Sequence, residues 1–92
     1  MTKEDYRTLH EAIDTYGSES QIKMVLEEMS ELQKEICKFW RGEDNKDQIA
    51  DEVADLEIVL AQLKLIFGIE ADVDDHRVRK LKRLSERLRS TE

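Results

Sequence analysis

Three glycines divide the chain into four segments, each of which has the pattern of a helix. Gly17, Gly42 and Gly68 each follow a run in which apolar residues recur every three or four positions. Helices often end at a glycine, because the residue after the last turn adopts a left-handed backbone conformation. The chain contains no proline. We therefore predict no strands and four helices, at residues 3–16, 19–41, 46–67 and 73–89.

Residues that cap helix N-termini precede these segments. Their side chains accept hydrogen bonds from the free backbone N–H groups of the first helical turn. Short connections between long helices make sequence neighbours antiparallel. We expect an all-α domain over residues 1–92, a four-helix antiparallel bundle, and we predict as its caps Thr2, Ser18, Asn45 and Asp72.

The two middle helices carry the strongest apolar stripes and are expected to pack along them. One stripe consists of Ile22, Val25, Met29, Leu32, Ile36 and Phe39, and the other of Ile49, Val53, Leu56, Leu60, Leu63 and Phe67. The first and last helices have weaker stripes. A chain this short buries a small fraction of its surface. We therefore expect a homodimer or homotetramer to complete the core.

Composition and charge exclude several classes of protein. A net charge of −7 argues against broad nucleic-acid binding, because phosphate backbones would be repelled. The single cysteine, Cys37, allows neither an intramolecular disulfide nor a cysteine-based zinc site. No apolar run approaches the roughly 20 residues of a membrane span, and no apolar stretch follows the N-terminal residues as in a signal peptide. A cytoplasmic protein without a membrane or nucleic-acid partner is expected.

Two pairs of acidic residues recur at matching positions of the middle helices. At about 100° per residue, Glu28 and Glu31 lie about 60° and 120° to one side of the apolar stripe. Glu52 and Asp55 have the same two offsets on the next helix. Four converging carboxylates repel one another unless a cation is present, and Mg²⁺ prefers oxygen ligands and keeps room for phosphates. A solvated acidic flank is the alternative interpretation.

The same residues resemble a known motif. Glu28-x-x-Glu31, followed after 20 residues by Glu52-x-x-Asp55, is similar to the signature of the MazG-like all-α nucleoside triphosphate pyrophosphohydrolases. The resemblance extends over residues 18–90 and is closest to the small phage and Firmicutes members. It implies that the four acids bind Mg²⁺, with Mn²⁺ as a possible substitute. It also implies that water cleaves the α–β phosphate bond of a nucleoside triphosphate, giving the monophosphate and pyrophosphate.

Candidate catalytic and substrate-binding residues surround the motif. Glu27 or Glu35 could orient or deprotonate the attacking water, and the sequence does not decide between them. Basic side chains suit the triphosphate, and Trp40 could stack on the base. Each basic residue could equally belong to a solvated helix face. The basic candidates are Lys38, Arg41, Lys80, Arg83 and Arg87.

Two other functions fit parts of the sequence. Phosphoribosyl-ATP pyrophosphatases share the acidic motifs, but they usually carry a Tyr-His pair where this chain reads Glu57-Ile58-Val59. The chain could also be a non-catalytic helical module whose acidic stripe binds a basic partner, since such stripes also serve oligomerising bundles. Magnesium binding distinguishes this last function from the enzymatic ones.

Overall fold

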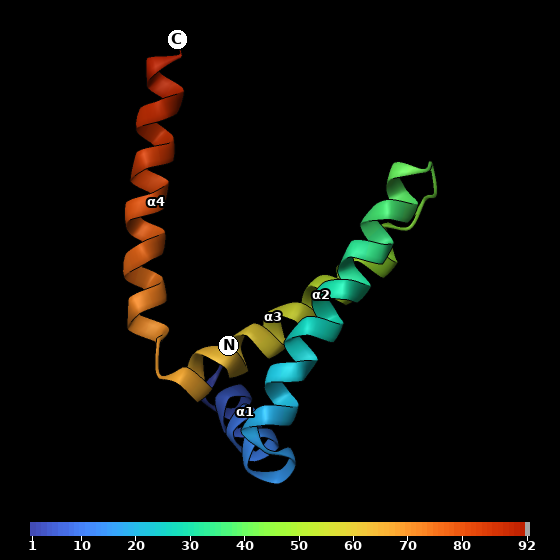
Figure 1. Cartoon of the computed structure of the whole chain (residues 1–92), viewed down its shortest axis with the longest axis vertical. Helices are drawn as coiled ribbons and strands as arrows, with labels where there is room; N and C mark the ends of the chain where they lie inside the picture. The colour runs from blue at the N-terminus through green and yellow to red at the C-terminus, as the bar shows by residue number, and fades with distance from the viewer. Residues whose placement is uncertain (92) are drawn as a thin grey trace.

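The computed structural model describes residues 1–91 and contains four α-helices, with no strand in that part of the chain. They are α1 (Lys3–Tyr16), α2 (Ser18–Trp40), α3 (Lys46–Phe67) and α4 (Glu70–Ser90). The prediction of an all-α domain with four helices is confirmed. Figure 1 shows α2 and α3 side by side as an antiparallel pair, α1 at the base of the pair, and α4 projecting away from it.

The predicted first cap is present, and it fixes where α1 begins. The Thr2 hydroxyl accepts a hydrogen bond from the Asp5 backbone N–H at 3.0 Å, and the Asp5 carboxylate accepts one from the Thr2 N–H at 2.8 Å. This reciprocal arrangement is a capping box. The helix α1 packs against both α2 and α3, and its residue Leu9 is buried.

The other predicted caps are not formed as expected. Ser18 is the first residue of α2, and Gly17 occupies the cap position without a side-chain hydrogen bond. Asn45 does precede α3, but its side chain turns toward α2 and leaves the N-terminus of α3 uncapped. α4 begins three residues early, after Ile69, so Asp72 lies within its first turn. There a carboxylate still stabilises the helix through the macrodipole.

The packed seam between α2 and α3 is rotated away from the predicted apolar stripes. Val25 of α2 and Val59 of α3 are buried in it as expected of apolar seam residues. Met29, Ile36 and Val53, which were expected to face the neighbouring helix, are exposed instead. Several acidic residues are withdrawn from water together with the apolar residues of this seam. They are Glu28, Glu35, Glu52 and Asp55.

α4 makes the molecule much more extended than a compact domain. Among the other helices its backbone approaches only α3. The radius of gyration is 16.4 Å, whereas a compact chain of this length has a value of about 12 Å. None of the described residues of α4 is buried. The all-α domain is therefore bundle-like, with α4 extending from the packed helices α1, α2 and α3.

No helix among residues 1–91 is both long enough and apolar enough to cross a membrane.

Candidate metal centre

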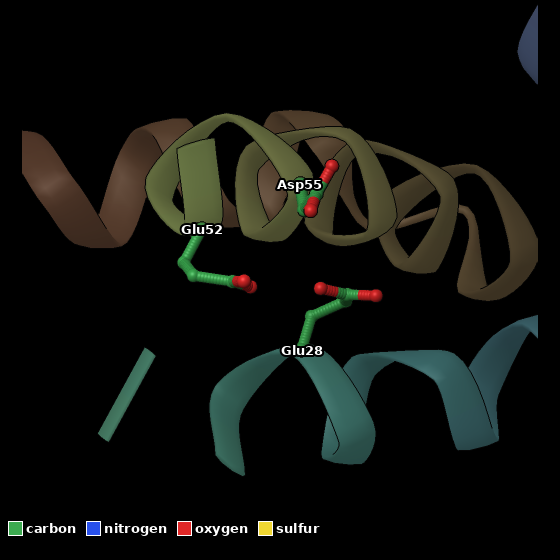
Figure 2. Close-up of side chains that lie close together, drawn as sticks. All are labelled: Glu28, Glu52 and Asp55. Atoms are coloured by element: carbon green, nitrogen blue, oxygen red, sulfur yellow. The ribbon is translucent and has the colours of Figure 1, made fainter. Parts of the chain in front are cut away.

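Three of the four motif acids converge between α2 and α3. Glu28 extends from α2 toward Glu52 and Asp55 of α3, and the three carboxyl groups meet in the space between the two helices (Figure 2). One oxygen of each side chain lies within 4.8 Å of the others. In α3, Glu52 and Asp55 are three residues apart, so both project from the same face of the helix. We call these three residues the acidic triad.

The triad is partly withdrawn from water. All three side chains are half-buried, and the Oε2 atom of Glu52 is buried without a hydrogen-bond partner in the described chain. A buried carboxylate oxygen without a partner is unfavourable, and such atoms are uncommon in folded proteins. This oxygen is therefore a candidate ligand for a cation.

Burial and mutual repulsion change the acidity of the triad. Burial raises the pKa of Glu28, and the Asp55 carboxylate raises it further. The pKa of Glu52 is raised by burial first and then by Glu28 and Asp55. Both effects disfavour the charged form. Glu28 and Glu52 therefore resist ionisation more than an ordinary glutamate does, and a nearby cation would offset this effect.

Glu31, the fourth predicted ligand, lies outside the triad. It is exposed on α2 and lines a shallow groove together with Glu27 and Glu28. Its charge nevertheless contributes to the raised pKa of Glu28, after burial and Asp55. Glu31 therefore adds negative charge near Glu28, but its carboxylate is not among the three that meet.

Glu35 has a structural role that the sequence did not suggest. Its carboxylate accepts a hydrogen bond from Asn45 Nδ2 at 3.0 Å, and its backbone carbonyl accepts another from the same nitrogen at 2.9 Å. Lys38 forms an ion pair with it at 3.1 Å. Hydrogen bonds from Asn45 and then Lys38 lower the pKa of Glu35. The Asn45 side chain thus connects the segment before α3 to α2 through hydrogen bonds.

The remaining predicted substrate residues lie apart from the triad. Trp40 is 85% exposed at the far end of α2, next to Arg41, which is also exposed. Lys38 is engaged with Glu35. The three basic candidates of the last helix project on α4, which does not contact α2 within residues 1–91, and these are Lys80, Arg83 and Arg87.

The position of Asn45 is predictable from the sequence, but its hydrogen-bond partner is not. An asparagine before a helix predicts an N-cap, and Asn45 does occupy the cap position of α3. That its amide would instead reach Glu35, ten residues earlier, depends on the path of the connection between α2 and α3. Val59 of α3 is buried in the core.

Comparisons of the chain with protein families, with curated proteins and with solved structures found no match.

Proposed function

We propose that this protein is a magnesium-dependent nucleoside triphosphate pyrophosphohydrolase. The observation that carries the proposal is the convergence of Glu28, Glu52 and Asp55, with ligand oxygens within 4.8 Å of one another. The resemblance of the motif to MazG-like enzymes supports the reaction, in which the α–β phosphate bond of a ribo- or deoxynucleoside triphosphate is cleaved.

The residues present fit a hard divalent cation. The triad offers only carboxylate oxygens, and one of them, Glu52 Oε2, is buried and unpartnered. Mg²⁺ binds oxygen ligands, commonly through one or two carboxylates together with water and substrate phosphates. When bound, such an ion neutralises charge on phosphoryl oxygens and lowers the pKa of water. Mn²⁺ has similar ligand preferences and is expected to substitute.

The chain itself supplies position and charge. α2 and α3 hold the triad on opposite sides of one seam, so that the two helices share the site. Burial and nearby acids raise the pKa of Glu28 and Glu52, so their ionisation should be coupled to the binding of a cation. Glu31, exposed beside Glu28, adds negative charge at the same edge.

Of the two predicted bases, Glu27 is the better placed. Glu35 is held by Asn45 and Lys38, and its pKa is lowered by the hydrogen bond from Asn45, so its carboxylate is a weak proton acceptor. Glu27 is exposed and lines the same groove as Glu28 and Glu31. We assign the role of orienting or deprotonating water to Glu27, and a positioning role to Glu35.

A panel of substrates tests the proposal. Purified protein is incubated with Mg²⁺ and each common ribo- and deoxynucleoside triphosphate, and with phosphoribosyl-ATP, and both pyrophosphate and orthophosphate are measured. We expect pyrophosphate and a nucleoside monophosphate from at least one triphosphate. Release of orthophosphate, or turnover of phosphoribosyl-ATP alone, would reassign the reaction.

The matched control is Glu52→Gln, purified in the same way. Glutamine preserves the size of the side chain but removes the charge, so the variant should lose at least about a hundredfold in kcat/KM, the order of effect expected when a group that stabilises transition-state charge is removed. Equal activity of the variant and the wild type would show that the pyrophosphate comes from a contaminant or from another site.

A further inference from the structure

A buried asparagine forms a polar connection between α2 and α3 at one end of their seam. Asn45, only 6% exposed, donates from Nδ2 to both the carboxylate and the backbone carbonyl of Glu35. Outside the acidic triad, every other side-chain hydrogen bond and ion pair within residues 1–91 joins residues three or four positions apart. We call the contact between Asn45 and Glu35 the register clamp.

Asn45 forms the register clamp at the expense of local stability. An asparagine at an N-cap position usually accepts a hydrogen bond from the first helical turn, but Asn45 makes no such bond to α3. Its Oδ1 atom is also buried without a partner within residues 1–91, and such atoms are uncommon in folded proteins. A residue that breaks local rules of stability in this way is typical of a position kept for specificity or function.

The register clamp lies next to the acidic triad along the seam. Glu35 follows Glu28 by seven residues, and Asn45 precedes Glu52 by seven residues. Seven residues are close to two helical turns, so each pair lies on one side of its helix, about 10.5 Å apart along the axis. Because α2 and α3 are antiparallel (Figure 1), both steps lead toward the same end of the seam. Glu35 and Glu52 also line a single groove, which places the clamp beside the triad.

The triad depends on the register of the two helices. Its ligand oxygens lie within 4.8 Å of one another, and a slip of one helical turn would move Glu28 by about 5.4 Å relative to α3. Smaller slips also matter, because Mg²⁺ demands near-ideal octahedral geometry at about 2.0–2.1 Å. The buried apolar residues of α2 and α3 are few and small, namely Val25, Val59 and Ala61. In paired helices, a single buried asparagine can specify the register at a cost in stability.

We infer that Asn45 is a positioning residue for the metal centre. By bonding to Glu35, it holds α2 and α3 in the register that brings the acidic triad together. The effect on metal binding rests on the proposed function, whereas the effect on the register can be measured without a metal. A residue that only stabilised the fold would change the fraction of folded protein, but it would leave the Mg²⁺ affinity of the folded molecules unchanged.

Calorimetric titration with Mg²⁺ separates positioning from stability. Asn45→Ser removes the amide that reaches Glu35, but serine is a good N-cap and can still stabilise the start of α3. Its Kd for Mg²⁺ should rise by about 10- to 100-fold, as when other residues that orient metal ligands are removed. Leu9→Ala is the control, because it removes a buried side chain of α1 and lowers stability without touching the clamp. Both variants are titrated well below their melting temperatures, after circular dichroism has shown that they are folded.

A conservative variant distinguishes the hydrogen bond of the clamp from the charge of Glu35. Glu35→Gln removes the charge, but its side-chain oxygen and its backbone carbonyl can both still accept hydrogen bonds from Asn45. Its Mg²⁺ affinity should therefore stay closer to that of the wild type than the affinity of Asn45→Ser does. Equal losses in Glu35→Gln and Asn45→Ser, equal losses in Leu9→Ala and Asn45→Ser, or a wild-type Kd in Asn45→Ser would each overturn the inference.

Spin labels measure the register directly in metal-free protein. One label is attached to the natural Cys37 of α2, which is exposed, and the other to Glu57→Cys at an exposed position of α3. Pulsed electron paramagnetic resonance should give one narrow distance distribution, which Asn45→Ser shifts or broadens and Leu9→Ala does not. A shifted distribution in a protein that binds no Mg²⁺ would support the effect on the register while removing the proposed function. An unchanged distribution in Asn45→Ser would overturn the inference, even if the wild type binds Mg²⁺ and hydrolyses nucleotides.

Discussion

At the scale of single residues, Glu28 and Glu52 carry their negative charge at a cost to the stability of the fold. Burial and the neighbouring acids raise the pKa of Glu28 and Glu52. A carboxyl group whose pKa is higher in the folded than in the unfolded state favours folding when protonated. Its cost is absent below the ordinary carboxyl pKa and grows as pH rises through the folded value. Such a cost is typical of sites kept for function.

Glu52→Gln should therefore not destabilise the metal-free protein. In EDTA at neutral pH we expect its melting temperature to equal or exceed that of the wild type, because the variant removes charge from a repulsive cluster. The difference should shrink toward about pH 4, where carboxyl groups become protonated in both states. Thermal melts followed by circular dichroism measure this. A lower melting temperature for Glu52→Gln at neutral pH would mean that the carboxylate supports the structure, and Glu27→Gln, at an exposed position, is the control.

Replacement of Asn45, in contrast to that of Glu52, is expected to lower the stability of the protein. Its amide donates two hydrogen bonds to Glu35, and both residues are buried. Asn45→Ala removes these bonds from groups that stay out of water, and the melting temperature should fall by on the order of 5–10 °C.

The pH dependence of the Asn45 effect also has a definite sign. The hydrogen bond from Asn45 lowers the pKa of Glu35, so its contribution to stability is present above the ordinary glutamate pKa and is lost as pH falls through the folded value. The difference between the wild type and Asn45→Ala should accordingly narrow in acid. A difference that stays constant down to pH values where Glu35 is protonated would contradict the assigned contact.

At the scale of helices, the sequence predicted the elements well and their facing sides poorly. Glycines and apolar spacing placed all four helices, since these signals act within a few residues along the chain. The stripe of α2 nevertheless combined two sides of the helix: Val25 is buried, whereas Met29 and Ile36 are exposed. An apolar position shows only that a residue avoids water. It does not show whether the residue is covered by its own chain or by a partner.

The sequence likewise predicts the acidic residues of the candidate metal centre but not which of them the packing of the helices brings together. The spacing of the motif brought together Glu28, Glu52 and Asp55 correctly, because residues three apart share a helix face. Glu31 was expected beside them, yet the rotated seam leaves it exposed. The placement of Lys80 depended on how α4 packs, which a weak apolar stripe does not determine.

The turn between α3 and α4 depends on one backbone conformation. Gly68 ends α3 with φ +64°, and a Cβ there would meet no atom within 4 Å. Gly68→Ala should therefore cost only the left-handed conformation itself, about 1–2 kcal/mol of unfolding free energy, as measured by denaturant titration. Gly68→Asn should cost less, because asparagine tolerates this conformation. An alanine variant as stable as the wild type would show that the turn is not formed in this way.

At the scale of the whole molecule, the pair of α2 and α3 carries the candidate metal centre, and α1 packs against both helices. The triad takes one ligand from α2 and two from α3, so the site exists only while the seam is intact. α4 contributes nothing to this seam within its own chain. The candidate metal centre and the projecting helix can therefore be tested separately.

Titration with Mg²⁺ by calorimetry, with and without a non-hydrolysable nucleoside triphosphate, tests the central claim most directly. We predict saturable binding to the wild type that weakens as pH falls, because the ligands must lose their protons. The same titration should show no binding to Glu52→Gln or Asp55→Asn, although both variants stay helical. Absence of binding to the wild type in both conditions, or undiminished binding to both variants, would contradict the assignment of Glu28, Glu52 and Asp55 as a metal centre.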